Sequence, residues 1–355
     1  MRIALDATPL AAAPGGIARY TSELSLALAR QFPQDQYLLL SDQRFPMPEQ
    51  APANLRPGRS PGSFPARRWW LCGLTIEMLR ERVDVFHGVD FAVPYLPLRP
   101  SVVTVHDLAP WKREDWNTSS PRVRRRAPYL LRLGLATMIV TPTARVRREL
   151  IDAFGVHSQR VAVVPLAAGD HFRPVEGPQP ARPYFLYVGA LEPRKNLSLL
   201  VEAWRAVRRR HQVDLVLAGR ARDDFRLPDA EPGLRITGEV AEAELPLLYS
   251  RAVACVYPSF YEGFGLPVLE AMQSGALVIA SDDESLVEVT AGAAIHRSAA
   301  SATAWVEAMT LALEQPGRVA AYRESALRRA REFTWQRTAQ LTRDVYEEAQ
   351  RRFRS

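Results

Sequence analysis

The sequence predicts an α/β protein built from two Rossmann-like βαβ domains that face a cleft. The chain has 355 residues, enough for two domains of ordinary size. Short β-rich runs alternate with helical stretches in both halves, as in parallel sheets with crossover helices. A polar, proline-rich stretch at 169–183 has the composition of a linker between the two halves.

The first half opens with a strand-like run at 2–6, and the Gly15-Gly16 turn then begins a helix over about 16–30. A second helix begins near Thr143. Further strands are expected at 36–41, 83–87, 101–106, 137–141 and 160–165. We assign the first domain to residues 1–175.

The second half repeats the alternation with a strand at 184–189 and a helix over about 196–210. Further strands are expected at 213–218, 234–237, 253–257 and 277–281. The region 301–352 reads as helical, and its last helix carries Trp335, Leu341, Val345 and Tyr346 at helical spacing. We assign the second domain to 176–333 and a C-terminal helix to 334–355.

Composition excludes several classes of protein. Hydrophobic residues make up 47% and charged residues 24%, which excludes disorder and collagen-like repeats. Cys72 and Cys255 match no metal-ligand spacing, so neither a zinc site nor a disulfide framework is expected. No apolar run reaches the ~18 residues that a membrane span needs, and we expect a cytoplasmic protein. The net charge of +7 favours anionic partners.

Lysine is rare in this chain. Of 46 lysine and arginine residues, only Lys112 and Lys195 are lysine. A lysine that persists in an arginine-rich chain indicates a position where a compact, flexible ammonium is required. The alternative is that these two lysines survived by chance.

The segment Tyr257–Met272 gives the strongest functional signal. A strand ends near Tyr257, a glycine-rich turn follows, and Pro267 stands where a helix begins. Such a turn presents backbone N–H groups to an anion. Glu262 before the helix and Glu270 inside it are spaced to touch different parts of one long ligand. The alternative is an ordinary strand–turn–helix connection with two solvated glutamates.

The segment Gly189–Asn196 places Arg194 and Lys195 at a strand-to-helix turn. Two cations there can hold a diphosphate and stabilise it as it leaves. Cations at a helix N-terminus oppose the helix dipole, which favours a bound anion as the counter-charge. The alternative is a basic helix start.

Three further segments give weaker signals. His106 ends another strand and can donate to a substrate oxygen, although a lone histidine is usually structural. The Gly15-Gly16 turn is not a dinucleotide fingerprint, so such a cofactor is not expected. Gly238, Glu239 and Val240 close a strand where backbone groups can border a flat heterocycle.

Taken together, these segments resemble the retaining glycosyltransferases of family 4, which have the GT-B fold. The resemblance covers essentially the whole chain, and Arg-Lys-Asn followed by E-x7-E around Gly-Phe-Gly-Leu-Pro carries most of it. It implies that the C-terminal helix crosses back to the first domain. It also implies a nucleotide-diphosphate sugar donor, and a saccharide or lipid-linked acceptor bound mainly by the first domain, including the loop Trp111–Ser120.

The resemblance also implies residue roles. Arg194 and Lys195 would bind the donor diphosphate, Glu262 the donor sugar and Glu270 the ribose. His106 would contact the sugar. The remaining donor-binding positions are Gly16, Gly189, Gly238, Glu239, Val240, Gly263, Phe264, Gly265 and Leu266. No metal is expected, because the two cations supply the positive charge and no D-x-D motif is present.

The substrates are expected to be those of bacterial surface-polysaccharide synthesis. The resemblance is to bacterial mannosyl-type transferases in particular. It therefore favours mannose from GDP-mannose as the donor, with UDP-sugars as the alternative. Aromatics beside cations at Arg67–Trp70, together with the arginines at 122–132, suit peripheral contact with the inner face of a membrane. A solvated arginine face is the alternative there. A non-catalytic nucleotide-sugar-binding module and a nucleic-acid-binding protein are the rival functions, and no nucleic-acid-reading motif is present.

Overall fold

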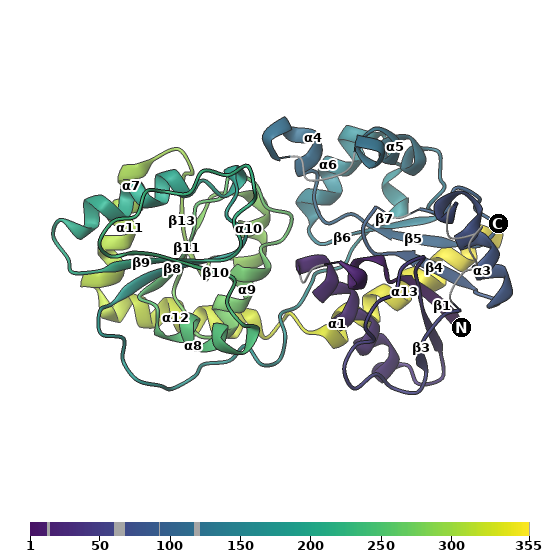
Figure 1. The fold of residues 1–355 in the computed structure, drawn as a ribbon, viewed down its shortest axis with the longest axis horizontal. Coiled ribbons are helices and arrows are strands. Elements are labelled where there is room, and N and C mark those ends of the chain that lie inside the picture. The colour runs from purple at the N-terminus through teal and green to yellow at the C-terminus, as the bar shows by residue number, and fades with distance from the viewer. Residues whose placement is uncertain (13–14, 60–67, 92, 117–120, 355) are drawn as a thin grey trace. The chain divides into compact units, whose positions relative to one another are not determined.

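The computed structural model describes residues 1–12, 15–59, 68–91, 93–116 and 121–354, without the side chains of residues 121 and 122. The chain divides into two compact units (Figure 1). Unit 1 comprises Met1–Leu108, Thr118–Leu166 and Thr334–Ser355. Unit 2 comprises Ala109–Asn117 and Ala167–Phe333.

Unit 1 is built on a parallel sheet of seven strands among the described residues, in the order β3-β2-β1-β4-β5-β6-β7. These strands are β1 (Arg2–Asp6), β2 (Gln36–Leu40), β3 (Leu55–Pro57), β4 (Val85–Gly88), β5 (Ser101–Thr104), β6 (Met138–Thr141) and β7 (Val161–Val163). Its helices are η1 (Thr8–Ala11), α1 (Gly16–Gln31), η2 (Trp69–Gly73), α3 (Leu74–Arg80), α5 (Pro121–Arg132), α6 (Ala144–Phe154), η4 (Ser158–Arg160) and α13 (Trp335–Arg354).

Unit 2 repeats this topology with a six-stranded parallel sheet in the order β10-β9-β8-β11-β12-β13. The strands are β8 (Tyr184–Val188), β9 (Asp214–Ala218), β10 (Leu234–Gly238), β11 (Ala254–Tyr257), β12 (Val278–Ser281) and β13 (Ile295–Arg297). The helices are α4 (Ala109–Lys112), η3 (Glu114–Trp116), η5 (Pro193–Lys195), α7 (Leu197–Arg208), η6 (Glu242–Glu244), α8 (Leu245–Arg251), α9 (Leu266–Gln273), α10 (Glu284–Thr290), α11 (Ala302–Glu314) and α12 (Pro316–Ala330).

The predicted fold class is confirmed, and the expected strands form with small shifts at their ends. The helix predicted near Thr143 is α6, whose first turn is capped by the Thr143 hydroxyl accepting from the Val146 N–H at 3.3 Å. Two strands, β3 and β13, were not predicted. Each is only three residues long and lies at a sheet edge, where a hydrophobic run is not required.

The C-terminal helix crosses back to the first domain, as the resemblance implied. Helix α13 follows α12 of unit 2 in sequence but packs on α1 and on β4–β6 of unit 1 (Figure 1). Arg343 Nε donates to Asp35 Oδ2 at 2.8 Å, and the Tyr346 hydroxyl lies 2.7 Å from His87 Nδ1. A partly buried ion pair and a buried hydrogen bond therefore join this helix to unit 1.

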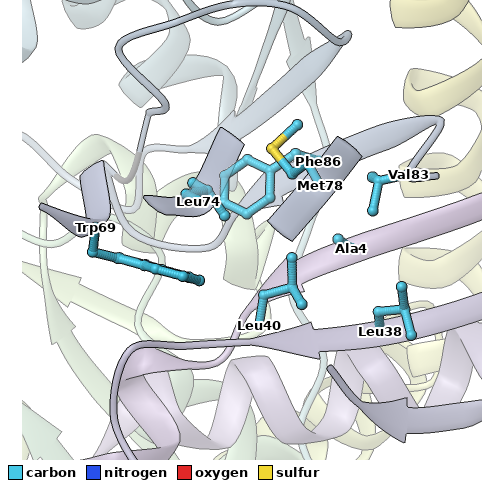
Figure 2. Packing of buried hydrophobic residues seen from close by; sticks show 8 residues of the cluster. All are labelled: Ala4, Leu38, Leu40, Trp69, Leu74, Met78, Val83 and Phe86. Carbon is cyan, nitrogen blue, oxygen red and sulfur yellow. The ribbon is translucent and has the colours of Figure 1, made fainter. Parts of the chain in front are cut away.

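One hydrophobic cluster of unit 1 fixes the short helix η2 against the sheet. Figure 2 shows Trp69 and Leu74 beside side chains of β1, β2 and β4. The cluster consists of Ala4, Leu38, Leu40, Trp69, Leu74, Met78, Val83 and Phe86, all buried, with Trp70 packed against it. Burial of the large aromatic side chain of Trp69 stabilises this packing, so η2 is held beside the ends of β1 and β4.

Candidate functional site

The strand order of unit 2 reverses between β8 and β11, and ligands of open α/β sheets bind at the carboxyl ends of strands at such a point. The loop after β8 contains Arg194 and Lys195, and the loop after β11 contains Glu262. The topology therefore brings these three predicted residues together although almost seventy positions separate them.

Glu262 is held by both cations. Lys195 Nζ donates to Glu262 Oε1 at 2.6 Å, and Arg194 Nη1 donates to Oε2 at 3.3 Å. Ser259 Oγ also donates to Oε1, at 2.7 Å. Burial by itself would raise the pKa of the Glu262 carboxyl, but the charges of Lys195 and Arg194 outweigh it and the pKa is lowered. Glu262 is therefore an ionised carboxylate, only 9% exposed.

A second carboxylate, which the sequence reasoning missed, also pairs with Arg194. Arg194 Nε and Nη2 donate to Glu192 Oε1 at 3.1 and 2.8 Å. Glu192 and Glu262 therefore supply counter-charges to the two cations within the protein itself. An acidic residue two positions before Arg194 in a tight turn was the available signal.

The glycine-rich turn has the backbone geometry that the sequence predicted. Gly265 has a φ of +91°, a conformation that favours glycine, and a Cβ there would lie 2.4 Å from Leu286 Cδ2. Helix α9 begins at the next residue, Leu266, which follows the buried Gly263 and Phe264. The first N–H groups of a helix lack intrahelical acceptors and can receive an anion.

Glu270 lies in α9 and is only 3% exposed. Its Oε2 accepts from the Tyr249 hydroxyl at 2.9 Å. Burial, together with the negative charge of Glu270, raises the pKa of Tyr249 well above its ordinary value. The alternative of two solvated glutamates is thus wrong for both Glu262 and Glu270. The sequence analysis did not single out Tyr249, because the residues of α8 form no motif that points to a binding site.

Three strand ends of unit 2 are joined by glycines. The Gly189 N–H donates to the Ala218 carbonyl at 2.9 Å, and the Gly219 N–H donates to the Gly238 carbonyl at 2.7 Å. A Cβ on Gly219 would lie 1.9 Å from the Gly189 carbonyl oxygen, so this unpredicted glycine permits the close approach. Gly238 is followed by the exposed Glu239 and the half-buried Val240.

The equivalent switch point of unit 1, between β1 and β4, holds a pocket of about 970 Å³. Asp6 ends β1, and Gly16 begins α1. Apart from its chain neighbours and the backbone of its own helix, no heavy atom of the described residues lies within 4 Å of the position of a Cβ on Gly16. The pocket is lined by, among others, Asp6, Gly16, Trp69, Trp70, Asp90 and Arg126.

His106 follows β5 in unit 1. Its Nε2 lies 2.8 Å from the Val89 carbonyl oxygen, which can only accept, so Nε2 carries the hydrogen. The edge of the Tyr20 ring meets the imidazole at 4.8 Å between centres and 86°. A neutral His106 therefore offers Nδ1 as an acceptor for a hydroxyl, and it donates from Nδ1 only when protonated.

Two features are absent from the described ranges. No group of three or more His, Cys, Asp or Glu side chains there could hold a metal ion. No helix in the same part of the chain is long and apolar enough to cross a membrane.

Comparison with known proteins finds two family models that together span most of the chain. Residues 14–168 match the model described as Glycosyltransferase Family 4, and residues 170–332 match Glycosyl transferases group 1. The O-antigen chain mannosyltransferase B of Escherichia coli is 32% identical over 294 residues, covering 76% of this chain and 75% of that protein. The glycogen synthase of Mycobacterium tuberculosis is 30% identical over 303 residues, covering 76% and 70%.

Solved structures share the fold at low sequence identity. Sucrose-phosphate synthase from Thermosynechococcus elongatus superposes with a TM-score of 0.78 at 20% identity, covering 98% of both chains. Anabaena HepE in complex with UDP and glucose gives a TM-score of 0.74 at 15% identity, covering 98% of this chain and 100% of that one. WaaG, a glycosyltransferase involved in lipopolysaccharide biosynthesis, gives 0.70 at 14%, covering 97% and 99%.

Proposed function

Because the chain belongs to the family 4 glycosyltransferases, a retaining family, and has the two-domain GT-B fold, we propose that it transfers mannose from GDP-mannose to a saccharide or lipid-linked acceptor. Relatives named as O-antigen mannosyltransferases support mannose and a role in surface-polysaccharide synthesis. The observation that carries the proposal is the buried contact of Lys195 and Arg194 with Glu262 at the switch point of unit 2.

The proposed chemistry follows from these charges. Breaking the bond between the sugar and the diphosphate builds positive charge on the sugar and negative charge on the leaving group. Arg194 and Lys195 would hold that diphosphate without a metal, and Glu262 would face the sugar. The acceptor hydroxyl attacks the same face of the sugar, and its proton passes to the leaving phosphate.

Glu270 and Tyr249 would hold the nucleoside. Glu270 accepts the Tyr249 hydroxyl, and the two oxygens of a carboxylate are hydrogen-bond acceptors of the kind that ribose hydroxyls require. The strand-end glycines at 189 and 238, with Glu239 and Val240, would border the base. The N–H groups at 264–266 would hold phosphate or sugar oxygens.

The acceptor would occupy the pocket of unit 1. Carboxylates suit sugar hydroxyls, and the pocket offers Asp6 and Asp90 beside the aromatic wall of Trp69 and Trp70. Gly16 leaves room at the start of α1. His106 would accept a hydroxyl of the donor sugar at Nδ1.

Peripheral contact with the inner face of a membrane is a second part of the proposal. Tyr129 and Leu133 are 66% and 76% exposed at the end of the arginine-rich helix α5. Exposed apolar side chains beside cations fit anionic headgroups. Co-sedimentation with anionic vesicles, lost in the double variant Tyr129→Ser/Leu133→Ser, tests this surface. Arg67 and the side chain of Arg122, which belong to the expected surface, lie outside the described residues, as do residues 117–120 of the expected acceptor loop.

The proposed function is tested by thermal unfolding with GDP, UDP, dTDP or ADP and no added metal. A ligand at ~100 times its Kd adds ~2.7 kcal/mol of stability, a readily measured shift. Selective stabilisation by GDP supports the mannosyl donor, and preference for UDP would replace that donor by a UDP-sugar. No response to any nucleotide would contradict the nucleotide-sugar donor. Binding without release of nucleotide from any sugar donor would favour the non-catalytic module.

A further inference from the structure

The chain's two lysines contact two neighbouring residues of one loop, Tyr261 and Glu262. Lys195 Nζ donates to Glu262, and Lys112 Nζ lies 5.0 Å from the centre of the Tyr261 ring. Every other basic side chain among the 46 lysine and arginine residues is arginine. An ammonium over an aromatic face is attracted by the ring's electrons. The convergence of both lysines on this loop gives Lys112 a place beside the donor site.

Lys112 belongs to a segment, residues 109–116, that lies between β5 and β6 in sequence but is part of unit 2. Ala109 and Trp116 form a buried cluster with Tyr261. Trp116 stacks on Phe260 at 6.3 Å and 15°, and on Tyr261 at 6.2 Å and 19°. The 109–116 segment is therefore held on unit 2 by aromatic packing.

A polar contact and a short helix anchor the same segment. Arg222 Nη2 donates to the Asp115 carbonyl oxygen at 2.6 Å. Helix η3 of the segment packs against η5, which carries Arg194 and Lys195. Trp116 is only 8% exposed as a result.

The two residues that Trp116 stacks on are both hydrogen-bonded to Arg194. The Tyr261 carbonyl accepts from Arg194 Nη1 at 3.0 Å, and the Phe260 N–H donates to the Arg194 carbonyl at 2.9 Å. Glu262 is the next residue. Displacing the two stacked rings would therefore displace the guanidinium and the carboxylate together.

Charge gives Lys112 a second effect. Arg194 and Lys195 are balanced by Glu192 and Glu262, so these four side chains carry no net charge toward an incoming diphosphate. Lys112 lies in α4, and its ammonium contacts the ring of Tyr261, the residue before Glu262. A cation near this site adds positive potential that favours an anion.

We propose that Trp116 and Lys112 are positioning residues of the donor site. Trp116 fixes Phe260 and Tyr261 so that Arg194 and Glu262 keep their geometry, and Lys112 favours the diphosphate electrostatically. This inference rests on the proposed function, because it assigns the diphosphate to that site. It adds to the donor site a segment that the sequence order places with the other domain.

The test of Trp116 compares W116A, W116L and W116F with the wild type. Binding of GDP and of UDP is measured by calorimetry, and release of GDP from GDP-mannose gives kcat and KM. We expect W116A and W116L to lower kcat by about 10–100-fold, because small misplacements of catalytic groups are costly. W116F, which keeps a stacking ring, should stay within about 3-fold of the wild type.

A matched control separates positioning from general loss of stability. Trp204 is fully buried in α7 of the same unit, and its Nε1 donates to the Val213 carbonyl at 3.0 Å. W204F should lower the Tm and leave kcat and the nucleotide Kd unchanged. If W116A lowers the Tm as W204F does but keeps wild-type kcat and Kd, Trp116 is only a packing residue and the inference fails.

Lys112 is tested by K112M and K112R, with R226M as the control. Arg226 is an exposed cation of unit 2 whose side chain is 91% exposed. K112M should weaken GDP binding about 3–10-fold at low salt and by less at high salt, whereas R226M should have no effect. Equal binding by K112M and wild type would overturn the electrostatic role of Lys112.

Failure of the inference and failure of the proposed function give different results. A wild-type protein that binds no nucleoside diphosphate overturns the proposed function and the inference together. A wild-type protein that binds and turns over its donor, with W116A and K112M indistinguishable from it, overturns the inference alone.

Discussion

In the proposed function, the diphosphate and Glu262 would compete for the same two cations. The carboxylate accepts from Lys195 at 2.6 Å and contacts Arg194 at 3.3 Å, so a diphosphate that takes those donors must displace or share them. Buried ion pairs are costly to break when one partner stays behind unpaired. Both cations therefore have hydrogen-bond acceptors even without a ligand. Substitution of the carboxylate or of the lysine should accordingly change how the site binds a diphosphate.

E262Q should separate binding from turnover. The amide oxygen can still accept from Lys195, but the negative charge is gone, so GDP affinity should be kept or rise while kcat falls by at least about 100-fold. Calorimetry and nucleotide release measure the two quantities. K195A, which removes a diphosphate ligand, should lose affinity as well. Turnover by E262Q near the wild-type rate would contradict the role of Glu262.

Asp6 gives unit 1 a pH dependence. Burial raises the pKa of the Asp6 carboxyl to about 6, partly opposed by the Thr8 hydroxyl and N–H that donate to it. A raised pKa means that stability is full below the unfolded value and is lost as the pH rises through about 6. D6N should therefore gain up to about 3 kcal/mol over the wild type between pH 4 and pH 7.5.

Chemical denaturation at several pH values measures that difference. The exposed Asp344 on α13 supplies the control, because D344N should track the wild type at every pH. A constant gap between D6N and wild type across this range would show that Asp6 does not titrate as its burial implies.

At the scale of elements, α13 is fixed to unit 1 by a specific polar contact. Tyr346 and His87 are fully buried, and burial lowers the pKa of His87 to about 3, so the ring is neutral. Y346F removes the hydroxyl 2.7 Å from His87 Nδ1 and should cost about 1–3 kcal/mol of unfolding free energy. Y129F, at an exposed tyrosine of α5, should cost nothing measurable. Equal stability of the two variants would contradict a buried hydrogen bond.

The sequence predicted elements where local pattern decides them. Strands such as β8 and β11 are continuous apolar runs, and the turn before α9 contains its own glycines and proline. The sequence alone therefore predicts that Lys195 and Glu262 lie in loops that follow these strands. The 109–116 segment could not, because its attachment to unit 2 depends on Trp116 meeting residues about 145 positions away. The same holds for the Tyr346–His87 contact, which only the folded chain creates.

At the scale of the whole molecule, one topology is used twice. The strand order reverses between β1 and β4 and again between β8 and β11, and each reversal holds a cluster of polar side chains. Glu192, Arg194, Lys195, Glu262 and Glu270 all belong to unit 2, whereas every residue that lines the 970 Å³ pocket belongs to unit 1. Most of the contacts proposed for the nucleotide therefore lie in unit 2, and those proposed for the acceptor lie in unit 1.

This separation predicts where a nucleotide protects the backbone. GDP should slow amide hydrogen exchange at 192–196 and 259–270, because its contacts with these residues would stabilise them against local unfolding. Amides around Trp69 in unit 1 should exchange at unchanged rates in the presence of GDP alone. The 109–116 segment should be protected together with 259–262, since Trp116 and Tyr261 are stacked. W116A should abolish that shared protection and W204F should preserve it. Protection confined to the pocket of unit 1 would place the nucleotide in the wrong unit and overturn the donor assignment.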